Sequence, residues 1–193
     1  LINGSVVFDA GTLKGAWNVN SGQQLVLAGG GIKTFDGATQ VLTNDGAVNW
    51  LASSGGLAFT NGASVVNNGL WDAQGDANLV YGGGGAASFV NNGTLRKSGG
   101  TGVTATSGNI GLINSGVIDV QTGTLRLAGY GTNIFNAGTS FIGAGVTELQ
   151  ASASFNGAFS STNLHITGGT HTGDAALING SVVFDAGTLK GAW

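Results

Sequence analysis

The chain has 193 residues, of which 38 are Gly and none is Pro, Cys or Met, and its formal net charge is −3. Without Pro and a three-residue glycine period it is no collagen, and 41% apolar with only 8% charged residues argue against disorder. The lack of Cys excludes disulfides and thiolate chemistry, and the lack of a basic patch argues against a nucleic-acid partner. No membrane-spanning segment is expected, because no apolar run is close to the ~20 residues that a spanning helix needs.

The sequence begins and ends with the same stretch. LINGSVVFDAGTLKGAW fills residues 1–17 and returns unchanged at residues 177–193. Such identity indicates a recent duplication, so residues 1–176 are interpreted as one tandem repeat and residues 177–193 as the start of the next copy. We expect residues 1–193 to form one continuous segment that belongs to a longer array.

A shorter period lies within the 176-residue unit. Asn-Gly or Asn-x-Gly recurs about every 22 residues, a period within the range that repeat folds use. The Asn residues of this column are Asn3, Asn20, Asn44, Asn67, Asn91, Asn114, Asn136, Asn156 and Asn179. The large repeat therefore divides into eight small ones.

After each of these glycines, apolar and polar residues alternate as in a strand with one buried face. In chain order, the second residue after the Gly is Val6, Gln24, Val48, Trp71, Leu95, Ile118, Ser140, Phe159 and Val182. The pattern shifts by one residue at Gln24, so Leu25 and Leu27 are predicted to point inward instead. Trp50 and Trp71 fall at inward positions and are predicted to lie in the core.

A second apolar stretch follows in most small repeats, as in residues 11–17 and 123–129, and ends near a Gly. A unit of ~22 residues cannot bury its own apolar face, but a stack of similar units can. The fold class predicted is all-β: a right-handed parallel β-helix, or β-solenoid, with about eight coils of ~22 residues per 176-residue repeat.

The Asn column has a structural and a functional interpretation. Asn tolerates a left-handed backbone at a turn, and stacked Asn amides can donate to one another along the axis. The Gly that follows would supply a positive φ at no steric cost. The functional alternative is hydrogen bonding to a ligand, and the regular recurrence favours turn chemistry.

Residues 89–131 resemble a known family. FVNNGTLRKSGGTGV and LINSGVIDVQTGTLRLAGYGT, with their N-x-G-T-L and V-x-T-G-T-L-x-L-A-G phrases, are similar to repeats of filamentous-haemagglutinin-like and autotransporter-passenger β-helices. The remainder of the chain is similar only loosely. The resemblance implies an extended stalk and adhesive surface on Gram-negative cells, and it carries no catalytic motif.

Asp72, Arg96 and Asp119 fall in one outward column on three successive coils of the alignment. Adjacent coils would bring them ~5 Å apart, which suits a surface charge ladder. The alternative is an acid–base site clamped by Arg96, because β-helical polysaccharide lyases and hydrolases use paired carboxylates. The pattern favours the ladder.

Other candidate sites are few. Asp72 and Asp76 are too few ligands for Ca²⁺, and His165 and His171, expected on the surface, lack partners for a metal site or a triad. We therefore expect neither a metal nor a cofactor. Trp17, Tyr81 and Tyr130 are candidates for glycan contact, because exposed aromatic rings stack on sugars.

The favoured function is a structural and adhesive segment of a secreted or surface-anchored bacterial protein with an outer-membrane-anchored parent. It would form a rod for cell adhesion, biofilm formation or host attachment. Expected partners are adjacent copies of the repeat end to end, host or matrix glycans, and identical rods on other cells. The alternatives are a β-helical polysaccharide lyase or hydrolase and a self-associating rod for cell–cell aggregation. Perfect duplication argues against an enzyme, whose catalytic sites are normally single.

Overall fold

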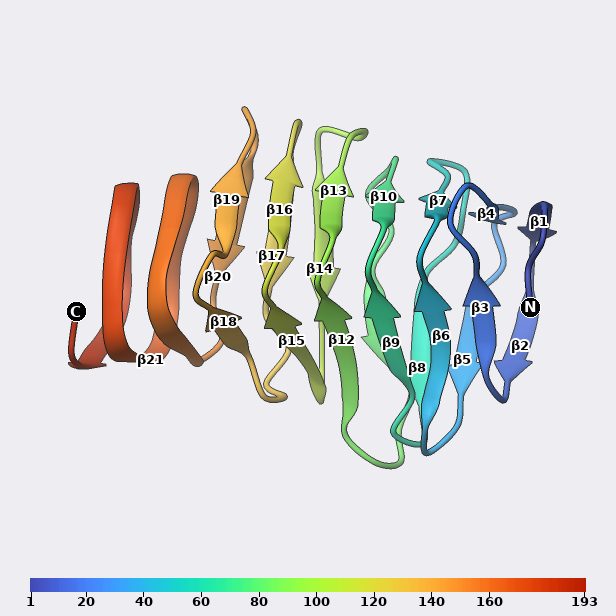
Figure 1. Ribbon diagram of the computed structural model, residues 1–193, viewed down its shortest axis with the longest axis horizontal. Helices are drawn as coiled ribbons and strands as arrows, with labels where there is room; N and C mark the ends of the chain where they lie inside the picture. The colour runs from blue at the N-terminus through green and yellow to red at the C-terminus, as the bar shows by residue number, and fades with distance from the viewer.

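Each coil of the chain contributes three short strands, which lie on three faces of an elongated solenoid (Figure 1). The computed structural model describes all residues from Leu1 to Trp193 and contains strands and turns but no helix. Because the repeat is rich in Gly and Asn and poor in helix-forming residues, turns interrupt the chain every few residues. The strands are therefore short and can bury apolar surface only by stacking on the coils beside them.

The first face consists of β1 (Ser5–Phe8), β4 (Gln24–Leu27), β7 (Ala47–Trp50), β10 (Leu70–Ala73), β13 (Thr94–Lys97), β16 (Val117–Val120) and β19 (Ser140–Ile142). The second face consists of β2 (Gly11–Lys14), β5 (Lys33–Asp36), β8 (Leu57–Thr60), β11 (Leu79–Tyr81), β14 (Val103–Thr106), β17 (Thr124–Leu127) and β20 (Val146–Leu149). The third face consists of β3 (Trp17–Val19), β6 (Gln40–Asn44), β9 (Ser64–Asn67), β12 (Ala87–Asn91), β15 (Ile110–Asn114) and β18 (Ile134–Asn136). The last element, β21 (Ala153–Gly191), winds round the C-terminal coils with positive φ at several turn residues, and it pairs with the last strand of every face.

All strand pairs are parallel, and each strand pairs with the strand one coil away. Along the first face the paired residues are, in turn, Ser5, Gln24, Ala47, Leu70, Thr94, Val117, Ser140 and Ser160. The structure is thus a β-solenoid of about seven turns with a spacing of about 23 residues. The predicted fold class is confirmed.

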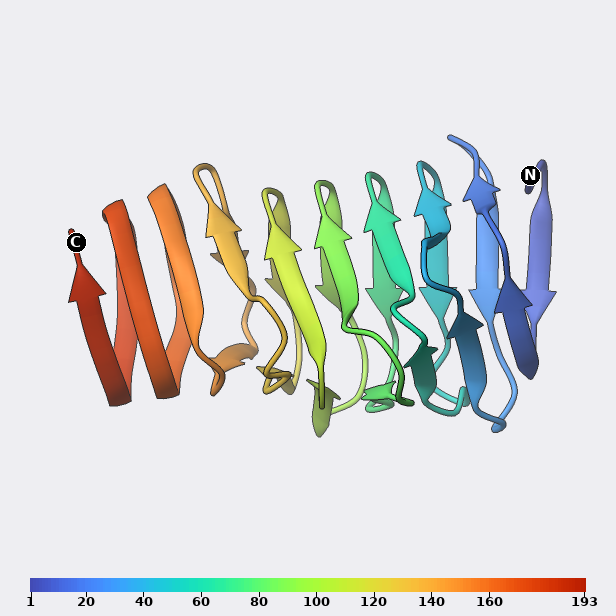
Figure 2. The same ribbon diagram turned by 90° about the horizontal axis from the view of Figure 1, so that it is seen from below.

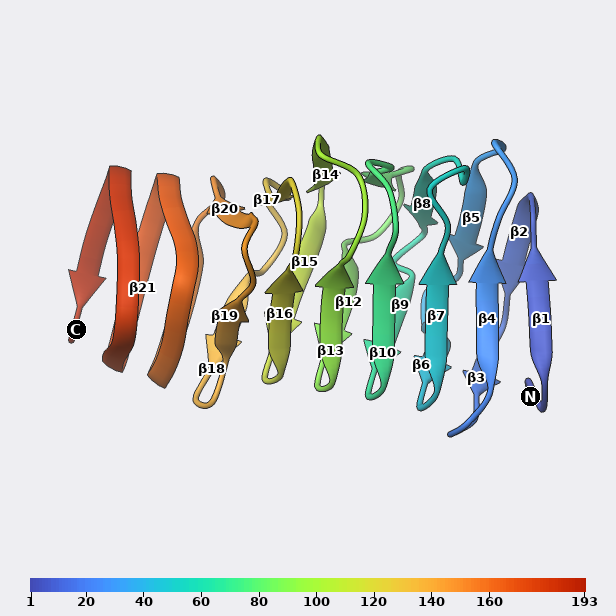
Figure 3. The ribbon, with the colours of Figure 1, turned by 90° about the horizontal axis from the view of Figure 1, so that it is seen from above.

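The coils wind with a right hand. In Figure 1 the chain advances from right to left, and the strands of the third face rise on the near side. Figure 3 shows the first-face strands β7, β10 and β13 crossing from the near side to the far side, and the second-face strands lie at the far side. This is the hand that parallel crossovers adopt in almost all proteins.

The interior is a set of stacked apolar columns. Along the first face the inward column is Val6, Leu25, Val48, Trp71, Leu95, Ile118 and Phe141. Leu25 and Leu27 are buried, which confirms the predicted shift in that repeat, and Trp50 and Trp71 are core residues as predicted. The assignment of Ser140 to the inward column is wrong, because the chain is displaced by one residue there and Phe141 fills the position.

The C-terminal part of the solenoid has an aromatic core. Figure 2 shows the termini at opposite ends of the long axis, with β21 winding round the C-terminal coils. In this part the core is aromatic: the ring of Phe155 lies 4.9 Å from Phe135, 4.9 Å from Phe159 and 5.3 Å from Trp193, measured between centroids. Stacked rings at this separation contribute beyond the area they bury.

Candidate binding surface

Four Asn side chains form a buried column on the third face. Asn44, Asn67, Asn91 and Asn114 occupy equivalent register positions and are 0% exposed. Nδ2 of each donates to Oδ1 of the next, over 2.6 Å from Asn44, 2.7 Å from Asn67 and 2.6 Å from Asn91. The amides also donate to the carbonyl oxygens of Leu70, Thr94 and Val117, at 2.9, 3.0 and 3.0 Å. These donors are satisfied within the protein and buried, so they are not presented to a ligand.

The buried column ends at Asn114. Its Nδ2 donates to Thr139 Oγ1 at 3.1 Å, and that hydroxyl donates to the carbonyl oxygen of Asn114 at 3.1 Å. Phe135, rather than Asn136, pairs in register with Asn114. The predicted single column of nine Asn residues is therefore divided, and Asn136 lies one position further along the chain.

The other five Asn residues are outside the core. Asn20 and Asn136 are half-buried, and Asn3, Asn156 and Asn179 are exposed. Asn20 Nδ2 donates to Asn3 Oδ1 at 2.5 Å, and Asn156 Nδ2 donates to Asn136 Oδ1 at 3.2 Å. An outer ladder of the same kind joins Asn92 to Asn68 and Asn68 to Asp45, at 2.9 and 2.8 Å. The Asn-Asn pairs at 67–68 and 91–92 were the sequence signal for this second ladder.

The backbone at these turns agrees with the prediction only in part: φ is positive, as expected, at Gly22, Gly138 and Gly157, but not at Gly69, Gly93 or Gly116. None of the nine Asn residues has a positive φ, so the expected left-handed Asn conformation is wrong. At Gly69, Gly93 and Gly116 glycine is required by close approach instead. A Cβ there would lie 2.1, 2.2 and 2.1 Å from the carbonyl oxygen of the stacked glycine one coil below. The Asn-x-Gly motif thus combines an inward amide with a residue that lets successive backbones touch.

Asp72, Arg96 and Asp119 pair in register on the outer side of the first face. Arg96 Nε contacts Asp119 Oδ2 at 3.0 Å, with side-chain exposures of 34% and 11%. Asp72 Oδ2 accepts a hydrogen bond from Gln74 at 3.1 Å, whereas its Oδ1 is buried without a partner. Arg96 therefore forms an ion pair with one carboxylate only, and the two Asp residues lie two coils apart with Arg96 on the coil between them.

Two more ion pairs lie on the second face, where strands in register bring opposite charges together. Arg126 Nε contacts Glu148 Oε2 at 2.7 Å, and Lys14 Nζ contacts Asp36 Oδ2 at 2.8 Å. The hydrogen bond from Lys14 lowers the pKa of Asp36, and the same contact raises the pKa of Lys14. Sequence alignment missed both pairs because it covered only the strands that directly follow the Asn-Gly motif.

Two lysines are buried at the turns between the first and second faces. Lys97, which is 0% exposed, donates from Nζ to Asp76 Oδ1 at 2.6 Å, to the Gly99 carbonyl at 2.7 Å and to the Gly75 carbonyl at 2.9 Å. Lys97 lowers the pKa of Asp76 through this hydrogen bond. Lys33, also 0% exposed, donates to two glycine carbonyls, and burial lowers its pKa. Each ammonium donates hydrogen bonds to turn carbonyls from inside the solenoid, and these bonds offset the cost of its burial.

The expectation that both His residues lie on the surface is wrong for His171. Its ring is 0% exposed, Nε2 lies 2.6 Å from the Gly168 carbonyl oxygen, and Nδ1 is buried without a partner. Burial lowers the pKa of His171. His165 is half-buried and pairs in register with Glu148 on the outer side of the second face.

The three aromatic candidates for glycan contact differ in exposure. Trp17 and Tyr81 pack against the core; Trp17 Nε1 donates to the Lys14 carbonyl at 2.9 Å, and the Tyr81 hydroxyl donates to the Gly84 carbonyl. Tyr130 is 72% exposed and is the one candidate whose ring is open to solvent.

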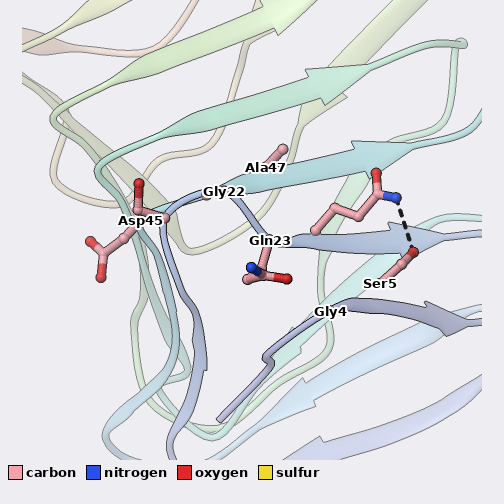
Figure 4. A pocket seen from close by; sticks show the side chains of 9 residues that line it. Gly4, Ser5, Gly22, Gln23, Asp45 and Ala47 are labelled. Atoms are coloured by element: carbon pink, nitrogen blue, oxygen red, sulfur yellow. Dashed lines mark hydrogen bonds between the residues drawn. The ribbon is translucent and has the colours of Figure 1, made fainter.

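A surface groove lies near the N-terminal end, between the third and first faces (Figure 4). It has a volume of about 620 Å³ and is lined by Gly4, Ser5, Ser21, Gly22, Gln23, Gln24, Asp45, Gly46 and Ala47. Gln24 Nε2 donates to Ser5 Oγ across it at 3.0 Å, and the Asp45 side chain points away from this pair. The groove offers amide and hydroxyl groups to a polar ligand, together with one carboxylate and no aromatic ring.

No group of three or more His, Cys, Asp or Glu side chains is placed to hold a metal ion. The chain contains no helix suited to crossing a membrane. Comparison with protein-family models, with curated proteins and with solved structures finds no match to this chain.

Proposed function

We propose that the chain is a segment of a long β-solenoid rod in a secreted or surface-anchored bacterial protein of the filamentous-haemagglutinin or autotransporter-passenger kind. The rod acts by its length, its stiffness and the repeated display of one surface for adhesion, biofilm formation or host attachment. Many weak contacts that repeat along a rod give strong attachment without a deep binding site.

The observation that carries the proposal is the match between the 176-residue period and a whole number of coils. The register runs in seven steps from Ser5 to Ser160 along the first face. One coil further on, the copied stretch returns to the first face: a Cβ on Gly180, the copy of Gly4 directly before Ser181, would lie 2.2 Å from the carbonyl oxygen of Ser161. A second repeat can therefore continue the same three faces without a break, and the surface of one repeat recurs along the axis.

The surface chemistry supports display over catalysis. The groove in Figure 4 holds one carboxylate, Asp45, and a second groove of about 580 Å³ also holds one, Asp76. Glycoside hydrolysis by the usual route needs two facing carboxylates about 5–10 Å apart. Asp72 and Asp119 lie two coils apart, with Arg96 on the coil between them, and line neither groove.

The proposal is tested by attachment. Beads carrying the chain as one repeat or as several tandem repeats, at equal surface density, are flowed over epithelial cells and over immobilised polysaccharides. Retention should rise steeply with repeat number, and control beads carry a compact protein of equal mass and charge. Retention no greater than the control at every repeat number would contradict adhesion. Release of sugar products that is abolished by Asp72→Asn would favour the lyase or hydrolase alternative.

A further inference from the structure

We infer that the groove in Figure 4, together with the outer Asn ladder that leads away from it, binds an extended neutral polysaccharide. The inference deepens the proposed function by naming a class of ligand, and it rests on that function for the repetition of the site along a rod. The groove is centred on residues 21–24. A coil of this chain flanks it on either side, one with Gly4 and Ser5 and the other with residues 45–47.

The groove lies at a turn that is longer than the corresponding turn of the next coil. Gln24 lies four residues after Asn20, whereas Ala47, its partner in register, lies three residues after the Asn of its own coil. The longer turn contains Gly22, where φ is 76° and an added Cβ would meet nothing within 4 Å. The backbone at Gly22 is therefore not packed against a neighbouring coil, and open space lies beside it.

Part of the groove is lined by polar groups that are already held in place. Asn49 Nδ2 donates to Gln24 Oε1 at 3.0 Å, and Gln24 Nε2 donates to Ser5 Oγ at 3.0 Å. The second N–H of Gln24 and the hydroxyl proton of Ser5 remain for a ligand. Groups that are fixed before a ligand arrives lose less conformational entropy on binding.

Gln23 adds an amide that is free to adapt. Its side chain is half-buried and makes no hydrogen bond to the other residues drawn in Figure 4, and the neighbouring Ser21 is exposed. A side-chain amide both donates and accepts hydrogen bonds. A sugar hydroxyl does the same, so the Gln23 amide and the hydroxyl groups of a sugar are complementary.

The outer ladder extends the site along the rod axis. Asp45, which lines the groove, accepts a hydrogen bond from Asn68 at 2.8 Å, and Asn68 accepts one from Asn92 at 2.9 Å. All three side chains are exposed. Each Asn uses one N–H in the ladder, so its second N–H remains for a ligand. Successive coils lie ~4.8 Å apart, so a chain that follows the axis meets one polar side chain per coil.

The residues of the site select the class of ligand. No Lys or Arg lines the groove and Asp45 is its one charged residue, so an anionic chain or a nucleic acid would be repelled. Ala47 is its one apolar side chain, so the groove lacks the pockets that hold the side chains of a bound peptide. A neutral polysaccharide can use the amide and hydroxyl groups without either penalty.

Binding at one site should be weak, because hydrogen bonds that replace those to water contribute little each and no aromatic ring lines the groove. In a tandem rod the site recurs once in each 176-residue repeat, roughly every 38 Å for eight coils. A long polysaccharide can therefore engage several sites together, which multiplies its affinity.

Titration of the single chain with soluble hexaoses tests the inference. Cellohexaose, laminarihexaose and maltohexaose are the neutral probes, and hexagalacturonate is the anionic probe of equal length. Binding is measured from the NMR signals of the side-chain amides. At least one neutral hexaose should shift the signals of Gln23, Gln24 and Asn68, and it should bind about tenfold or more tightly than hexagalacturonate.

A double variant, Gln23→Ala with Asn68→Ala, removes two amides of the site at positions outside the core. The affinity for the neutral hexaose should fall about tenfold, because two hydrogen bonds are lost. Gln150→Ala is the matched control, since Gln150 is an exposed Gln that follows β20 on the second face, and it should leave the affinity unchanged. Circular dichroism checks that both variants are folded.

Four results would overturn the inference: no binding of any neutral hexaose, equal or tighter binding of hexagalacturonate, an unchanged affinity in the double variant, or a loss of affinity in Tyr130→Ala alone. Oligomers that the double variant abolishes, without sugar binding, would assign this edge to a second copy of the chain instead. The bead assay keeps the proposed function separate. Bead retention on cells without hexaose binding would overturn the inference alone, whereas hexaose binding without retention would contradict adhesion and leave the inference standing.

Discussion

Asn91 Nδ2 donates to Asn114 Oδ1 over 2.6 Å at the centre of the solenoid, and both residues are fully buried. The same link joins Asn44 to Asn67 and Asn67 to Asn91. A buried amide is stabilising only when its donors and acceptors are satisfied, and here each Asn meets that need only if the coils stay in register. The column therefore fixes how one coil lies on the next.

Asn91→Ala should lower the free energy of unfolding by about 2–3 kcal/mol, because it leaves buried polar groups of Asn67 and Asn114 without their partner. Urea denaturation followed by circular dichroism measures the change. Asn92→Ala is the matched control: Asn92 is exposed in the outer ladder, and its loss should cost less than about 0.5 kcal/mol. Equal losses for the two variants would show that the buried column has no special role.

Gly93→Ala should destabilise the chain by about 2 kcal/mol or more, since the added Cβ would force two stacked backbones apart. The Cβ would lie 2.2 Å from the carbonyl oxygen of Gly69. Gly30→Ala provides the control, because a Cβ at Gly30 meets nothing within 4 Å and its φ is ordinary. The control should be neutral or slightly stabilising in the same denaturation experiment. A tolerated Gly93→Ala would mean that the coils are not in close contact at this turn.

Lys97→Met should destabilise the chain by about 1–3 kcal/mol at pH 7, since it leaves the Gly99 carbonyl without its buried donor. The loss should shrink in acid. The pKa of Asp76 is lowered by Lys97, so the stabilisation from this pair is present above pH 3.8 and disappears as the pH falls through the folded-state pKa. Denaturation at pH 7 and pH 3 measures the difference. Lys14→Met, at a side chain that is 72% exposed, should change the midpoint little at either pH.

The burial of His171 predicts that the free energy of unfolding depends on pH just below neutrality. Burial lowers the pKa of His171 below 6.5, so the unfolded chain binds a proton that the folded chain does not bind as the pH falls below that value. Stability should be complete above pH 6.5 and decline below it until the folded-state pKa is reached. His171→Phe should flatten the melting temperature between pH 7 and pH 5, whereas His165→Gln should keep the slope. A slope that survives His171→Phe would exclude His171 as its source.

The architecture could be predicted from the sequence because two patterns are visible in it. A strand with one buried face alternates apolar and polar residues, and the stacking of coils repeats the Asn-Gly motif about every 22 residues. The sequence predicted the shift at Gln24 from the positions of Leu25 and Leu27. The sequence did not show that the Asn column divides into buried and exposed residues, because the Asn-x-Gly motif is the same whether its Asn is buried or exposed. The sequence aligns Ser140 with Ile118, but in the structure Ser140 pairs with Val117. Ser140 lies four residues after Asn136, whereas Val117 lies three after Asn114, and only coordinates show this shift.

The charged and titratable residues were harder to place. Lys is normally exposed and His is intermediate in burial, so residue type alone did not predict the full burial of Lys97, Lys33 and His171. These side chains are buried because backbone carbonyls at the turns point into the solenoid and need hydrogen-bond donors there. The sequence does not show which turn carbonyls point inward. The ion pairs Arg126–Glu148 and Lys14–Asp36 form because their strands lie in register on the second face. The number of residues per coil varies along the chain, so the sequence did not give the register of the second-face strands.

The central claim is that coils stack without a break from one 176-residue repeat into the next. Small-angle X-ray scattering tests it on a chain that carries residues 1–176 twice, compared with a chain that carries them once. The account predicts that the maximum dimension grows by roughly 38 Å, about eight coils at ~4.8 Å each, while the cross-sectional radius of gyration stays the same. A particle that thickens instead of lengthening, or two bodies joined by a flexible link, would contradict it.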